Sequence, residues 1–273
     1  SPPAQSRHMN TLNPVSLPLH RRILRMRVDA TSYELATHQI LDWAQHQEHR
    51  YVCAANVHMA MSVFDSPQFA EVVNQADLVT PDGMPLVWAL RWFGIPDAQR
   101  VYGPTLMLQV CAAAAAQRVP IGLYGGTVES LDDFVKFLES KFPGIEIVCR
   151  IAPPFRSVTP VEAADYRQQI IDSAAQIVFV GIGCPKQEQW MAAHTSQIPA
   201  VLLGVGAAFD FHSGRVKQAP SWMQNNGLEW LFRWYQEPGR LWQRYLYNNP
   251  RFIVFLGYQW LTERLNRQSS QAK

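Results

Sequence analysis

A single acidic residue stands out among the side chains that can do chemistry. Asp82 follows the short apolar segment Leu78–Thr80, adjoins Gly83 and is otherwise surrounded in sequence by apolar residues. Burial of a carboxyl in such surroundings raises its pKa towards the range of a useful general base. An aspartate here can equally cap a helix beginning near Met84, and the two roles are compatible. Asp82 is therefore the first candidate for proton transfer.

A second candidate is a phosphate-binding loop at Gly181–Gln187. Two glycines and a proline separate a predicted strand from a predicted helix there, so that backbone N–H groups and Lys186 can approach a phosphate. Lys186 or Gln187 is the candidate ligand of a diphosphate. The third glycine of the dinucleotide fingerprint is missing, which disfavours a nicotinamide-dependent enzyme. Glycine-rich strand ends are also frequently only tight turns, and that interpretation stays open.

Metal-binding and serine-hydrolase patterns are missing from the sequence. It contains no Asp-x-Asp, no His-Glu-x-x-His and no Gly-x-Ser-x-Gly. Asp210 and His212 form the most suggestive acidic and imidazole pair, but a polar loop explains them better than metal ligation does. We therefore expect no metal ion and no cofactor.

Aromatic residues and arginines alternate towards the C-terminus. Five of the nine tryptophans lie after residue 220, and residues 222–267 contain six arginines against three glutamates. Such a helical segment covers the rest of the protein, or places an apolar face in a membrane with arginines on anionic headgroups. An apolar patch there can also pair subunits, so homo-oligomer formation stays open.

The segments between these features alternate between helical and strand-like patterns. Alternation at this spacing indicates an α/β fold, Rossmann-like, with a mainly parallel sheet and helices on both faces. In such sheets, ligands bind beyond the carboxyl ends of the strands, where Asp82 and Gly181–Gln187 are expected to lie. Helices are predicted at 32–47, 59–73, 84–93, 105–117, 130–141, 160–173 and 186–194, and strands at 51–55, 78–80, 121–124, 145–149, 177–180 and 200–205.

Composition and order together predict the organisation of the 273 residues. Residues 1–20 are interpreted as a disordered leader, 21–220 as the α/β domain, and 221–273 as a C-terminal helical appendage. The formal charge of +2 gives no reason to expect a nucleic-acid partner. Four widely spaced cysteines fit a reducing cytoplasm. No apolar run is long enough for a transmembrane helix.

Several blocks, in the same order, resemble the WecG/TagA/CpsF family of bacterial glycosyltransferases over about residues 25–260. This linked series is far more specific than any single motif. The blocks are Asn56, Ala76–Gly83, Arg100–Gly103, Val180–Glu188, Gly204–Phe211 and Gly227–Arg233.

The resemblance implies transfer of a hexose or N-acetylhexosamine-type sugar from a UDP-sugar to a polyprenyl-diphosphate-linked sugar in cell-surface polysaccharide biosynthesis. It implies inversion and no metal ion. The protein is then expected in the cytoplasm, peripheral on the inner face of the cell membrane. The composition leaves two alternatives open, a nucleotide-dependent oxidoreductase and a non-catalytic lipid-docking scaffold.

The same resemblance implies roles for individual residues. Asp82 is the expected general base, with Asn56 and Arg100 lining its pocket. Gln187, with Lys186 beside it, is expected to contact the UDP diphosphate, and Asp210 to hold the ribose. The candidates for the lipid diphosphate are Arg233, Arg240 and Arg244.

The sequence departs from the family pattern at three places, one of which is Met84–Pro85, where some members have a glycine-rich continuation after the Asp-Gly pair. Ala54 replaces a frequent threonine, which puts one donor contact in doubt, and Gln218 replaces a usual arginine.

Overall fold

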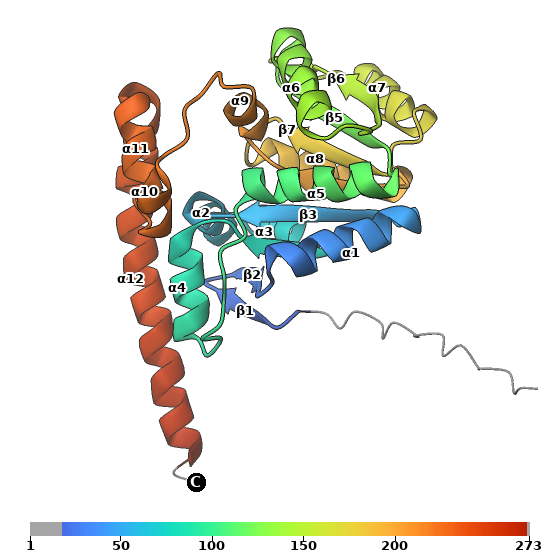
Figure 1. The fold of residues 1–273 in the computed structure, drawn as a ribbon. Coiled ribbons are helices and arrows are strands. Elements are labelled where there is room, and N and C mark those ends of the chain that lie inside the picture. The colour runs from blue at the N-terminus through green and yellow to red at the C-terminus, as the bar shows by residue number, and fades with distance from the viewer. Residues whose placement is uncertain (1–17, 272–273) are drawn as a thin grey trace, which may run out of the picture.

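The computed structural model describes residues 18–271 of the chain and contains a central six-stranded parallel sheet (Figure 1). The strand order is β4-β3-β8-β7-β5-β6. Each strand is short and rich in apolar residues, as expected for strands that are covered on both faces. The strands are β3 (Arg50–Ala55), β4 (Leu78–Pro81), β5 (Ile121–Gly125), β6 (Ile147–Ile151), β7 (Ile177–Gly181) and β8 (Val201–Gly204).

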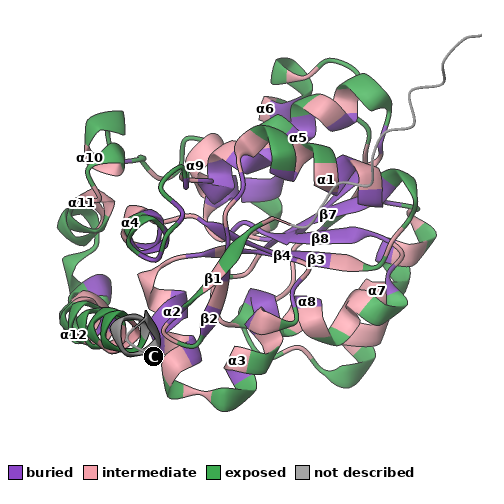
Figure 2. Ribbon diagram, turned by 90° about the horizontal axis from the view of Figure 1, so that it is seen from below, coloured by how far each residue is buried: buried purple, intermediate pink, exposed green. Residues whose placement is uncertain are grey.

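Helices cover both faces of the sheet, which confirms the predicted fold class. Successive strand residues alternate between two buried clusters, one on each face. One face packs against α1 (Tyr33–Gln45), α5 (Gly103–Gln117) and α6 (Val128–Lys141). The other packs against α2 (Val57–Asp65), α3 (Pro67–Asn74), α7 (Pro160–Asp172) and α8 (Lys186–His194). Figure 2 shows the buried strands enclosed between these two layers.

The predicted helix at 59–73 is wrong as a single element, because the chain forms two helices there. Ser66 ends α2, and its side chain accepts a hydrogen bond from the backbone N–H of Phe69 at the start of α3. Pro67 occupies the first turn of α3, where its missing N–H costs nothing. The Ser-Pro pair is thus a boundary signal that the apolar periodicity conceals.

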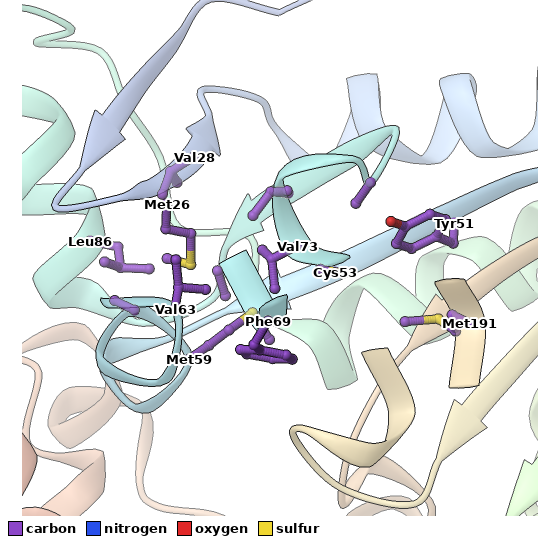
Figure 3. Close-up of a cluster of buried hydrophobic side chains, with 14 of the residues drawn as sticks. Met26, Val28, Tyr51, Cys53, Met59, Val63, Phe69, Val73, Leu86 and Met191 are labelled. Atoms are coloured by element: carbon purple, nitrogen blue, oxygen red, sulfur yellow. The ribbon is translucent and has the colours of Figure 1, made fainter. Parts of the chain in front are cut away.

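An antiparallel hairpin precedes the sheet and was absent from the sequence prediction. Its strands are β1 (His20–Ile23) and β2 (Met26–Asp29). The Asp29 carboxylate accepts from the backbone N–H of Val79 at 2.7 Å, which fastens the hairpin beside β4. Met26 and Val28 join the cluster drawn in Figure 3. The hairpin begins inside the predicted leader, whose residues 1–17 lie outside the described ones.

Two elements are more exposed than their sequences predicted. The sequence of helix α4 (Met84–Trp92) is apolar nearly all round, as in a buried helix, but Trp92 is 63% exposed and Trp88 is 37% exposed. The strand predicted at 145–149 is found as β6 at Ile147–Ile151, and its position at the sheet edge leaves alternate residues exposed. In both cases the apolar pattern of the sequence does not show whether another element packs against the apolar side chains.

The C-terminal segment consists of α10 (Ser221–Asn225), α11 (Glu229–Gln236) and the long helix α12 (Pro238–Gln271). Helix α12 lies along α2 and extends past α4 (Figure 1). Phe252 and Leu256 are buried in the core, and the Arg251 guanidinium pairs with both carboxylate oxygens of Asp65 on α2. Among residues 18–271, no helix has the length and apolar character needed to span a bilayer.

Candidate active site

The candidate site lies beyond the carboxyl ends of the strands. Strand β5 connects outward to β6, whereas its neighbour β7 connects in the opposite direction to β8, so the chain connections diverge between β5 and β7. Ligands of doubly wound sheets bind at such a divergence. Helix α11, the first turns of α12 and the short α9 (Ala208–His212) lie over the same end of the sheet (Figure 1).

Asp82 is half-buried immediately after β4, and its position is fixed by backbone groups. Its Oδ1 accepts a hydrogen bond from the backbone N–H of Gly103 at 2.5 Å. A Cβ at Gly103 would stand 3.2 Å from that oxygen and 3.3 Å from the Cβ of Ala54, so glycine permits this close approach. Burial raises the pKa of Asp82 to about 6, with the Arg100 charge opposing this effect and the Glu229 charge adding to it.

Arg100 connects Asp82 to the C-terminal segment. Its Nε donates to the backbone carbonyl of Asp82 at 2.5 Å, and its Nη2 donates to Glu229 on α11 at 2.6 Å. The Tyr102 hydroxyl donates to the same Glu229 carboxylate at 3.2 Å, and the Arg100 guanidinium stacks over the Tyr102 ring. Sequence reasoning missed Glu229 and Tyr102 as site residues, although both lie in the blocks that carry the family resemblance.

Asn56 lies beside this network, and its side chain already has a structural role as the N-cap of α2. Its Oδ1 accepts from the backbone N–H of Met59 at 3.0 Å, which caps the N-terminus of α2. Its Cβ is 3.6 Å from the position of a Cβ at Gly83, so Asn56 lies directly beside the Asp82–Gly83 turn. The structure thus brings Asn56, Asp82 and Arg100 together as predicted.

The loops after β7 and β8 are joined by Gln187. Its Oε1 accepts from the backbone N–H groups of Gly183 and Gly206, each at 3.2 Å, and its Nε2 donates to Glu188 at 3.0 Å. Lys186, the first residue of α8, is exposed. The prediction that Gln187 and Lys186 contact a diphosphate stays a prediction, but the polar atoms of Gln187 are held by the protein itself.

Asp210 and two of the three candidate arginines line one cavity of about 150 Å³. Asp210 lies on α9, Arg233 on α11 and Arg240 at the start of α12. The Arg233 guanidinium lies 5.9 Å from the centre of the Phe211 ring and is close enough to Asp82 to lower the pKa of that carboxyl. Arg240 is paired with Glu237. Burial raises the pKa of Asp210.

Arg244, the third candidate arginine, lies deeper than the other two. Burial lowers the pKa of its guanidinium, and its buried Nε has no hydrogen-bond partner among the described residues. The charges of Arg233 and Arg240 and the Cys184 thiol are among the groups that influence it. Arg244 therefore faces the loop after β7, and the three arginines form a cationic rim from Asp82 to that loop.

The described residues contain no group of three or more histidine, cysteine, aspartate or glutamate side chains arranged to hold a metal ion. The positively charged side chains around the site are Arg100 before α5, Lys186 on α8, Arg233 on α11, and Arg240 and Arg244 on α12. Gln218, the residue where the family usually has arginine, is exposed before α10.

A half-buried carboxyl lies near several arginines at the carboxyl end of an α/β sheet, an arrangement compatible with an enzyme of the group-transfer class. The comparison with known proteins makes this specific. Residues 21–266 match the model of the "Glycosyl transferase WecG/TagA/CpsF family", and the chain belongs to that family. The resemblance seen in the sequence is confirmed, and the oxidoreductase and scaffold alternatives lose support.

Two bacterial relatives have the same name, N-acetylglucosaminyldiphosphoundecaprenol N-acetyl-beta-D-mannosaminyltransferase. The protein from Bacillus spizizenii is 26% identical over 228 residues, which cover 83% of this chain and 86% of the relative. The protein from Bacillus subtilis strain 168 is 29% identical over 223 residues, covering 81% and 83%.

Proposed function

We propose that this protein transfers an N-acetylhexosamine-type sugar from a UDP-sugar to a sugar carried on polyprenyl diphosphate, with inversion and without a metal ion. The observation that carries the proposal is the half-buried Asp82, with a pKa of about 6, near Arg100 and Arg233 at the carboxyl end of the sheet. The names of the two relatives support the acceptor, since both act on an undecaprenol-diphosphate-linked sugar.

In the proposed reaction Asp82 takes the proton of the acceptor hydroxyl. Gly103 fixes Oδ1, so the carboxylate is oriented before substrate arrives. The acceptor oxygen then attacks the anomeric carbon of the donor from the face opposite UDP. The bond between that carbon and the diphosphate oxygen breaks, which inverts the anomeric centre. A base with a pKa of about 6 is ionised at neutral pH and still basic enough to assist the attack.

Arginine and lysine side chains neutralise the departing diphosphate in this mechanism. Arg233 lines the same cavity as Asp210 and is also near Asp82, so it is placed to contact the diphosphate while Asp210 holds the ribose. Lys186 contacts the UDP diphosphate from the start of α8. Arg240 and Arg244 bind the diphosphate of the lipid-linked acceptor. Fixed cations in a partly desolvated site stabilise developing negative charge without a metal ion.

The test is a calorimetric titration of the full chain with UDP and a panel of UDP-sugars, in EDTA and then in Mg²⁺. It is followed by transfer to a polyprenyl-diphosphate-linked N-acetylglucosamine. Binding and transfer in EDTA, with an inverted product anomer, are expected. Binding that appears only with Mg²⁺ would overturn the metal-free part. Failure of UDP to bind under either condition would overturn the donor assignment.

We further propose that the C-terminal segment docks this enzyme peripherally on the inner face of the cell membrane. Helices α4, α11 and α12 lie together on one side of the molecule (Figure 1), and each carries exposed large apolar side chains. Arginines on the same helices suit anionic headgroups. The exposed side chains are Trp92, Trp234, Tyr235, Trp242, Ile253, Val254, Tyr258 and Trp260.

Vesicle sedimentation tests the docking. The double variant Trp92→Ser/Trp260→Ser should weaken binding to vesicles with anionic phospholipid about tenfold, because both tryptophans line one apolar groove and lose their burial in lipid. Phe155→Ser, which removes an 85% exposed side chain outside these helices, is the matched control. Unchanged vesicle binding together with loss of a dimer in sedimentation velocity would show that the surface pairs subunits instead.

A further inference from the structure

The structure contains a buried carboxyl that the proposed reaction does not use. Glu188 on α8 has no exposed surface, and burial raises its pKa to about 7. Oε1 accepts from Gln187, whereas Oε2 has no hydrogen-bond partner among the described residues. A buried carboxyl with an unsatisfied oxygen destabilises the fold, so a role other than stability is expected for it.

The surroundings of Glu188 contain no ion-pair partner. Cys53 faces it from β3 and Cys184 from the loop after β7, and burial raises the pKa of both thiols, so neither carries charge at neutral pH. Gln187, its remaining polar neighbour, is also neutral. Glu188 therefore interacts through directional hydrogen bonds, from the Gln187 amide and from the Cys184 thiol.

The hydrogen bond between Gln187 and Glu188 determines which way the Gln187 amide points. With Nε2 donating to Glu188, Oε1 faces the N–H groups of Gly183 and Gly206. The opposite orientation would place an NH₂ group against two N–H donors and an oxygen against the Glu188 acceptor. The absence of a side chain at Gly204 provides space for the Gln187 amide, because a Cβ there would stand 3.1 Å from Nε2 of Gln187.

The two loops that Gln187 joins carry the candidate donor site. Gly183 adopts φ 87° and leads through Cys184 and Pro185 to Lys186, while Gly206 adopts φ 58° and precedes Ala207, which lines the cavity with Asp210. Their N–H groups are used by Gln187, so these two amides are not the ones that bind phosphate. Loss of this link would allow Lys186 and Asp210 to move independently.

We infer that Glu188 is a positioning residue for the nucleotide half of the donor: it orients Gln187, which locks the loops after β7 and β8 at one fixed separation. This inference rests on the proposed UDP-sugar donor. It assigns Gln187 an indirect role, in which the amide holds the loops that contact the diphosphate and ribose.

The test compares four variants with the wild-type chain at pH 8. Glu188→Leu removes the acceptor at similar volume, and Glu188→Gln keeps an acceptor oxygen. Gln187→Glu places two carboxyls in contact, and the exchanged pair Gln187→Glu/Glu188→Gln restores one donor facing one acceptor. Gln189→Leu, at an exposed position of the same helix, is the control.

Two readouts are measured, the Kd for UDP by calorimetry and the hydrogen-exchange protection of the Gly183 and Gly206 amides by NMR. Glu188→Leu and Gln187→Glu should each raise the Kd about tenfold and lower both protection factors about tenfold, since one buried hydrogen bond is lost. Glu188→Gln and the exchanged pair should stay within about threefold of wild type. In Glu188→Leu, KM for the donor should rise while kcat changes little.

The inference is overturned if Glu188→Leu leaves either readout at the wild-type value, or if the exchanged pair is no better than Gln187→Glu. Its failure is separable from failure of the proposed donor, because amide protection is measured without any nucleotide. A wild-type chain that does not bind UDP would overturn the proposed function while its protection factors still test the link between the loops.

Discussion

Two carboxyls with raised pKa values lie at the carboxyl end of the same sheet, and their surroundings differ in kind. Asp82, beside β4, is half-buried among Arg100, Arg233 and Glu229. Glu188, beneath β7 and β8, is fully buried among neutral groups. Burial is the largest cause of the raised pKa in both cases.

The difference shows why a raised pKa alone does not identify a catalytic base. Asp82 adjoins the cationic rim, where a substrate hydroxyl and an anionic leaving group can both be accommodated. Glu188 reaches only the protein interior, so its proton has no path to a substrate. The β4 side of the site therefore holds the groups for proton transfer, and the β7–β8 side holds the groups that keep loops in place.

The largest effect is expected from Asp82→Asn. The amide keeps the size of the side chain but cannot accept the acceptor proton, so transfer should fall about 10³-fold, or ~4 kcal/mol. UDP affinity should stay near the wild-type value, because Asp82 belongs to the acceptor side. Single-turnover transfer and UDP calorimetry measure the two quantities. If the variant transfers sugar at a rate within tenfold of wild type, Asp82 is not the base, and the proposed functional difference between Asp82 and Glu188 is wrong.

The second largest effect is expected in the pH dependence of stability, and it arises from Glu188. Its pKa is raised from 4.5 to about 7 in the folded protein, so the folded state binds the proton more tightly than the unfolded state. The free energy of unfolding therefore falls as pH rises from about 4.5 to about 7, and the full penalty, on the order of 3 kcal/mol, is present above pH 7.

Glu188→Gln should remove this penalty. Urea unfolding at pH 5 and pH 8 is expected to show the variant close to wild type at the lower pH and more stable at the higher pH. An equal difference at both pH values would mean that Glu188 does not titrate in this range.

A smaller effect is expected in the pH dependence of transfer, because only ionised Asp82 acts as a base. The rate should fall as pH drops below about 6. Glu229→Gln removes a negative charge that raises the pKa of Asp82, so the midpoint should move to lower pH, with a loss of rate of about tenfold from the broken Arg100 pair. Arg100→Gln removes a charge that lowers the same pKa, so its midpoint should move to higher pH. Midpoints that move in the same direction would contradict this assignment of charges.

Local sequence patterns predicted the sheet and the place of Asp82 at a strand end, whereas the place of Arg100 beside it followed from the family resemblance. Strands β3 and β4 are short, largely apolar runs followed directly by Asn56 and Asp82, and β5 and β7 end in glycine. These ends converge because the carboxyl ends of parallel strands meet at one edge of the sheet. Asp82 and Arg100 lie 18 positions apart, and the chain returns to the same strand end between them.

The remaining site residues depend on packing that no local pattern records. Glu229 reaches Arg100 across 129 positions, because α11 folds back over the sheet. In the sequence, Glu188 looks like any glutamate in the first turn of an exposed helix. In the structure its side chain is buried. The exposed face of α4 was missed for the same reason, since its apolar residues do not show whether a neighbour covers them.

The smallest effect is expected at a third carboxyl, which lies outside the site. Asp65 at the end of α2 pairs with Arg251 of α12, and this pair lowers the pKa of Asp65. Its stabilisation is therefore present above the unfolded pKa near 3.8 and is lost as pH falls. Because the Asp65 side chain is 42% exposed, solvent screening limits the contribution of the pair to about 0.2–1 kcal/mol.

Asp65→Asn should accordingly change the urea midpoint slightly at pH 7 and leave transfer at the wild-type rate. Phe252, Leu256 and the Phe64–Phe255 stack keep α12 in place without the ion pair. A loss of transfer as large as that of Glu229→Gln would show that the docking of α12 on α2 controls the site from a distance. The groups that keep the site in place would then include the contact between α12 and α2, in addition to the loops on the β7–β8 side.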